Sequence, residues 1–261
     1  MDMKISGAGV LSGGEYDDVK ISGSAKIEGS IRCRSFSCAG AAKGQGDLRC
    51  LEDFRSSGST HVTGEVSAQN AEVSGSLKCS SLAAEKEVKL FGGVHIEGKL
   101  SGGDVRASGG LKVGDGIEAE SFRYSASTAG PISTGGKLQC DGLLNAETVV
   151  ITLGLEKHSI DAIGGGSVKV EERPEGGMFG VFGSPGPFSF PWGKPSAGCL
   201  NVSESIEADQ VEIVNTVCPA VSGRRVKIGR GCKIDLVRYS ESIEVDPDAQ
   251  VDRQERPERS L

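Results

Sequence analysis

The chain has few aromatic residues and no long apolar run. Phenylalanine, tyrosine and tryptophan make up 5% of its 261 residues, and apolar residues make up 37%. This composition is low for the core of a globular enzyme. No segment approaches the ~18 apolar residues of a membrane-spanning helix, and residues 1–7 lack the apolar stretch of a secretory signal. We therefore expect a cytoplasmic protein, either free or held peripherally at the inner face of the cell membrane.

Positive charge is also in short supply. Lysine and arginine number 29 against 36 aspartate and glutamate residues, a net charge of −7. This balance provides no electrostatic reason to expect a nucleic-acid partner. Basic and aromatic residues are not interleaved either, as they are in proteins that bind single strands. We expect no nucleic acid among the partners.

Motifs of common catalytic, cofactor and metal sites are absent. The eight cysteines contain no CxxC pair, so a zinc site is not indicated, and free cysteines pack as small hydrophobes. His61 and His95 lie two repeats apart, about 10 Å in a stacked ladder, which is too far to share a metal directly. We predict that the chain is not an enzyme and has no catalytic, cofactor-binding or metal-binding residues.

What the sequence does contain is a repeat of 17 residues that is marked by glycine. Six repeats are aligned by the column Gly23, Gly40, Gly58, Gly75, Gly92 and Gly109. Each repeat carries three pairs of apolar residues with one residue between, which in the first repeat are Ala25/Ile27, Ile31/Cys33 and Phe36/Cys38. Alternation is typical of short strands with one inward face, and three strands per repeat form one coil. The predicted fold is an all-β, three-sided parallel β-helix, or β-solenoid.

The repeat defines four segments. We expect the main solenoid body over residues 4–172, an irregular insertion over 173–197, further coils over 198–245 and a disordered charged tail over 246–261. Two irregularities are expected inside the body. One extra residue near Asp53 predicts a bulge or a wider corner, and about ten residues between Ser125 and Thr134 fit no strand.

The insertion is rich in glycine, proline and aromatic residues, which excludes a regular helix or strand. We expect its apolar side chains to cover the solenoid, to contact a partner protein or to touch a membrane surface. The candidate contact residues are Met178, Phe179, Val181, Phe182, Phe188, Phe190 and Trp192.

Four blocks of the repeat resemble the bactofilins, polymer-forming cytoskeletal proteins of bacteria. They are the residues 19–29, 72–79, 141–147 and 226–237, and the last block is similar to the longer Gram-positive members. The resemblance implies a right-handed solenoid that assembles end to end into filaments without a nucleotide. It also implies a homopolymer, or a mixed polymer with a paralogue, that scaffolds the cell envelope, cell shape or motility machinery through a partner protein. The N-terminal membrane-targeting segment of some members is missing.

The ends of a solenoid expose unpaired strand edges, so we expect the first coil to form the polymer contact. The candidate residues are Ala8, Val10, Tyr16, Val19 and Ile21. The alternative is a solenoid that does not polymerise and binds a partner protein or membrane surface on one flank. Inside the coils, the register points Glu85 inward, as an exception among the carboxylates.

Overall fold

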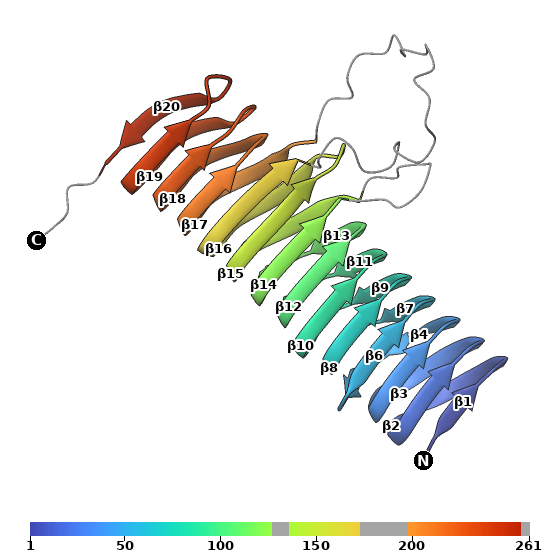
Figure 1. Cartoon of the computed structure of the whole chain (residues 1–261). Helices are drawn as coiled ribbons and strands as arrows, with labels where there is room; N and C mark the ends of the chain where they lie inside the picture. Colours follow the sequence, from blue (N-terminus) through green and yellow to red (C-terminus); the bar gives the residue numbers. More distant parts are fainter. Residues whose placement is uncertain (127–135, 173–197, 257–261) are drawn as a thin grey trace, which may run out of the picture.

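The computed structural model describes residues 1–126, 136–172 and 198–256, and every regular element in these ranges is a β-strand. The predicted β-solenoid is confirmed: parallel strands stack along one axis, with the two termini at opposite ends of the molecule (Figure 1). The strands are β1 (Met3–Ile5), β2 (Ala8–Ile21), β3 (Ser24–Cys38), β4 (Ala41–Gln45), β5 (Leu48–Cys50), β6 (Asp53–Ser56), β7 (Ser59–Val62), β8 (Glu65–Val73), β9 (Ser76–Cys79), β10 (Ser81–Leu90), β11 (Gly93–Ile96), β12 (Leu100–Ser108), β13 (Gly110–Val113), β14 (Ile117–Ser125), β15 (Leu138–Leu153), β16 (His158–Glu172), β17 (Leu200–Ile213), β18 (Thr216–Ile228), β19 (Lys233–Val245) and β20 (Gln250–Glu255).

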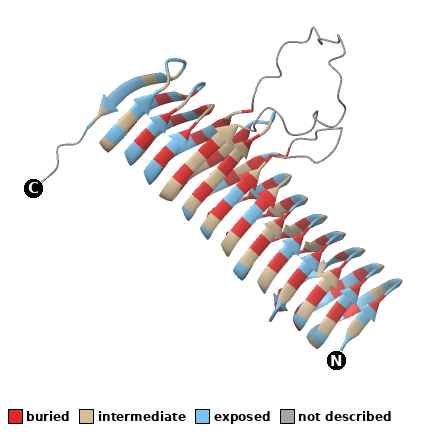
Figure 2. Cartoon of the chain, in the orientation of Figure 1, coloured by how far each residue is buried: buried red, intermediate tan, exposed pale blue. Residues whose placement is uncertain are grey.

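The repeat length sets the register between coils. Val94 of β11 pairs with Leu77 of β9 and with Leu111 of β13, each 17 residues away. Parallel pairing at this offset places equivalent side chains above one another, so the inward residues form continuous columns. Buried residues run through the whole stack as one core (Figure 2).

The three inward pairs per coil are found, with one shift in register. In the fourth repeat, Leu82 and Ala84 are buried while Glu85 is exposed. The prediction that Glu85 points inward was therefore wrong. A register shift between Ala84 and Glu87 in the pairing of β8 with β10 supplies the physical reason, because such an irregularity moves the side chains that follow it to the other face.

The glycine column is explained by close backbone contact between coils. A Cβ added at Gly40 would lie 1.8 Å from the carbonyl oxygen of Gly23, and one added at Gly75 would lie 1.8 Å from that of Gly58. Neither residue has a positive φ. Glycine is required here because the preceding coil leaves no room for a side chain at this corner.

The expected irregularity near Asp53 is also present. Cys33 pairs with Cys50 at an offset of 17 residues, whereas Phe36 pairs with Phe54 at an offset of 18. The extra residue is accommodated between the end of β5 and the start of β6. The other irregular segment lies mostly outside the described residues, as does the insertion 173–197.

The predicted disorder of the tail was wrong for residues up to 255. β20 pairs in parallel with β19, where Ile234 aligns with Val251 and Arg238 aligns with Glu255. The alternating pattern is weak in this segment because β20 lies at the end of the stack and only Val251 packs against the core. Residues 257–261 lie outside the described ranges.

Alanine at Gly75 tests the role of the glycine column. We expect Gly75→Ala to lower the free energy of unfolding by roughly 1–3 kcal/mol, since its methyl group must displace a backbone carbonyl. Gly93→Ala is the matched control, because no atom lies within 4 Å of a Cβ built there, and it should change stability by less than about 0.5 kcal/mol. Denaturant unfolding followed by circular dichroism measures both, and equal effects would contradict the packing explanation.

Candidate functional surfaces

The cysteines are packed in the core. Seven of the eight are buried and all eight are free thiols. Burial raises the pKa of Cys79 and of Cys140 to about 12, so these thiols stay protonated and weakly nucleophilic at neutral pH. Within the described ranges no group of three or more His, Cys, Asp or Glu residues is placed to hold a metal ion.

Cys33 and Cys50 form the closest thiol pair. They lie in adjacent coils with their Sγ atoms 3.7 Å apart. The neighbouring thiol and burial together raise the pKa of Cys50. The geometry is a hydrogen-bonded pair of thiols in the core rather than a reactive centre.

His158 is the one buried histidine. Its Nδ1 accepts a hydrogen bond from the backbone N–H of Leu138 at 3.1 Å, and its ring lies edge-on to Tyr124, with the centroids 5.5 Å apart. Among the described residues Nε2 has no hydrogen-bond partner. Burial lowers the pKa of His158 to about 4, so this residue is a neutral structural group at pH 7.

The N-terminal end of the solenoid contains three of the five predicted contact residues. Ala8, Val10 and Tyr16 lie in the part of β2 that pairs only with the following coil. Val10 is 55% exposed. Val19 and Ile21 do not lie on this end, because β1 pairs with them and buries them.

The apolar cross-section at this end is partly closed by its own side chains. Leu11 is fully buried although it belongs to the first coil. Ile5 leans over Gly9, where an added Cβ would lie 3.2 Å from its Cγ2. Tyr16 donates a hydrogen bond from its hydroxyl to the carbonyl oxygen of Ser12 at 2.8 Å. What stays open is therefore the strand edge and Val10, rather than the core.

The C-terminal end presents a second edge that the sequence did not indicate. Ile243 and Val251 are only partly buried against the core, and Val245 is 37% exposed. β20 pairs with β19 alone among the described strands. The signal was weak because charged residues separate the apolar positions of this last coil.

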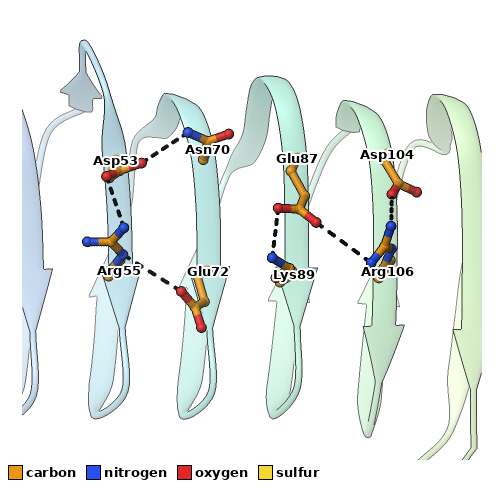
Figure 3. Close-up of polar contacts among 8 residues, drawn as sticks. All are labelled: Asp53, Arg55, Asn70, Glu72, Glu87, Lys89, Asp104 and Arg106. Carbon is orange, nitrogen blue, oxygen red and sulfur yellow. Dashed lines mark hydrogen bonds and ion pairs between the residues drawn. The ribbon is translucent and has the colours of Figure 1, made fainter.

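One side face is covered by two parallel columns of charged and polar residues (Figure 3). These columns are Asp53, Asn70, Glu87 and Asp104 in one, and Arg55, Glu72, Lys89 and Arg106 in the other. Arg106 pairs with Asp104 at 2.6 Å in its own coil and with Glu87 at 3.9 Å in the previous coil. Opposite charges thus compensate one another within and between coils, and this face is locally neutral.

The seven aromatic-loop candidates, from Met178 to Trp192, lie outside the described residues. In the ranges that the structure covers, no helix is long and apolar enough to span a membrane.

Two proteins of Bacillus subtilis (strain 168) are similar to part of the chain. YhbF is 30% identical over 110 residues, which cover 42% of this chain and 40% of YhbF. YhbE is 33% identical over 112 residues, which cover 42% of this chain and 41% of YhbE. Both are described as uncharacterized, and the chain matches about two-fifths of the length of each. No protein-family model matches the chain, and no solved structure matches it significantly.

Thiol labelling tests the packing of the cysteines. Because Cys199 is the only cysteine that is not buried, we expect a thiol reagent to modify it first in the native protein. The other seven should react only after unfolding, as read by mass spectrometry of the labelled peptides. Labelling of Cys79 or Cys140 as fast as Cys199 would contradict the structure.

The buried His158 predicts a loss of stability in mild acid. Its folded pKa lies below that of a free histidine, so the unfolded chain binds the proton first and stability falls as the pH drops from about 6.5 toward 4. From pH 7 to 5.5 this contributes roughly 1 kcal/mol. His158→Asn should be less stable at pH 7 and should have a flatter pH dependence in this window. An unchanged slope in the variant would assign the acid sensitivity to other groups.

Proposed function

We propose that the chain is a structural, polymer-forming scaffold protein that assembles end to end without a nucleotide, as the bactofilin resemblance implies. The observation that carries the proposal is an unpaired strand edge at each end of the described stack. β1 pairs only with β2, and β20 pairs only with β19, among the described strands. Unpaired edges are templates for pairing with another chain.

The two ends also match in register on one side face. Following the pairing from coil to coil, the column that begins at Lys4 ends at Glu244. Its inward neighbours are Met3 and Ile5 at the first coil, and Ile243 and Val245 at the last. Continuing the stack into a second copy places Lys4 against Glu244, with apolar residues on both sides.

The same continuation brings Glu15 close to Glu255. This repulsion is compensated inside each chain, because Glu255 pairs with Arg238 at 3.1 Å and with Arg253 at 3.3 Å. Glu15 lies 3.9 Å from Arg32. The favourable contact at Lys4 therefore has no uncompensated counterpart on the neighbouring face.

Electron microscopy and sedimentation of the purified protein test the proposal. We expect filaments or large oligomers without added nucleotide, and we expect Lys4→Glu to reduce them because it places two carboxylates at each junction. The exchanged double variant Lys4→Glu/Glu244→Lys should restore assembly. Lys20→Glu is the matched control, since Lys20 occupies the same column one coil further in.

Two results would contradict the proposal. A monodisperse monomer at every protein and salt concentration would favour the alternative, a binding scaffold that does not polymerise. Polymers that disappear when residues 176–193 are deleted, with the fold retained by circular dichroism, would move the contact away from the ends and to the insertion.

A further inference from the structure

A column of like charges on a second side face is not explained by folding. In six successive coils the same outward position holds Lys26, Lys43, His61, Lys78, His95 and Lys112. At about 4.8 Å per coil, the column is about 24 Å long. It is preceded by Val10 and followed by Gln139 in the same register. We refer to these six residues as the basic ladder.

Stacked like charges on adjacent strands are destabilising, and the charged face described above avoids them. There, acidic residues of the neighbouring column compensate every cation drawn in Figure 3. In the basic ladder, Lys26 pairs with Glu28 at 2.6 Å and Lys78 pairs with Glu97 at 3.0 Å. Lys43 and Lys112 are exposed and have no ion pair among the described residues.

The surface beside the ladder is open to a ligand. The column two residues earlier contains only small residues, which are Ser24, Ala41, Ser59, Ser76, Gly93 and Gly110. No atom lies within 4 Å of a Cβ built on Gly93 or Gly110. The serine hydroxyls stand next to the cations, where they are able to donate hydrogen bonds to an anionic oxygen.

The first part of the ladder lies in a groove of about 880 Å³, whose lining includes Lys26, Lys43 and His61. The core provides a reason for this hollow. Gly44 contributes no side chain to the inward column that holds Ile27 and Val62. A Cβ at Gly44 would lie 2.1 Å from the carbonyl oxygen of Ile27, so the wall has closed in on the core at this point.

From these features we propose that the basic ladder binds a linear phosphate polymer that lies along the solenoid axis. A thin chain with regularly repeated charge matches a straight row of cations with serine donors beside it. A concave groove fits such a chain better than the flat surface of a bilayer. No aromatic residue occurs in the ladder or in the small-residue column, so nucleic-acid bases have no stacking platform here.

Fluorescence anisotropy with labelled long-chain inorganic polyphosphate tests the proposal on the full chain. The variant Lys43→Gln/Lys112→Gln removes the two unpaired lysines. We expect it to weaken binding roughly tenfold and to reduce the slope of log K against log salt by about 1.5. The matched control Lys20→Gln/Lys233→Gln removes the same charge from two exposed lysines outside the ladder, and it should bind nearly as well as the unmodified chain.

Three outcomes would overturn the proposal. Equal weakening in both double variants would indicate a response to net charge alone. Equal affinity for orthophosphate and for the long chain would remove the argument from the row. Ladder-dependent binding to anionic phosphatidylglycerol vesicles without binding to polyphosphate would identify the face as a membrane contact. Sedimentation of the Lys43→Gln/Lys112→Gln variant separates these results from assembly, because the ladder lies on a flank and not on the ends.

Discussion

The structure depends on the close parallel stacking of one coil directly on the previous one. At the glycine corner the backbones approach so closely that a Cβ on Gly92 would lie 1.8 Å from the carbonyl oxygen of Gly75. This contact fixes the repeat length, and the repeat length aligns the inward residues into one core. Each coil then contacts mainly its neighbours, so stability is close to a sum of coil and interface terms. The protein is long and narrow because no contact closes the stack.

The same stacking turns every outward position into a row. Where adjacent rows carry opposite charges, as with Arg55 between Asp53 and Glu72, the face is locally neutral. Each such exposed pair adds only about 0–1 kcal/mol, so charge compensation matters more for solubility and register than for total stability. The basic ladder departs from this rule on the opposite principle, since cations repeat without alternation. A repeat protein thus writes one-dimensional binding surfaces with single outward positions.

Much of the fold could be predicted from the sequence because the period is strict. The glycine column, the apolar pairs and the extra residue near Asp53 all follow from counting. Glu85 was misplaced because a bulge in β10 shifts the register locally, and single-residue shifts leave no clear signal in the residues that surround them. β20 was missed because a terminal coil buries one face poorly and needs few apolar residues. Val19 and Ile21 were assigned to the end because β1 is only three residues long.

Hydrogen exchange measured coil by coil in Ile27→Asp tests the nearest-neighbour account most directly. Ile27 is 1% exposed in the core, and an unpaired carboxylate in this apolar column costs several kcal/mol. The account predicts that the coils around β2, β3 and β4 lose protection while the coils from Gly92 onward keep it. A uniform loss of protection along the whole chain would contradict the claim that stability is transmitted only between neighbouring coils.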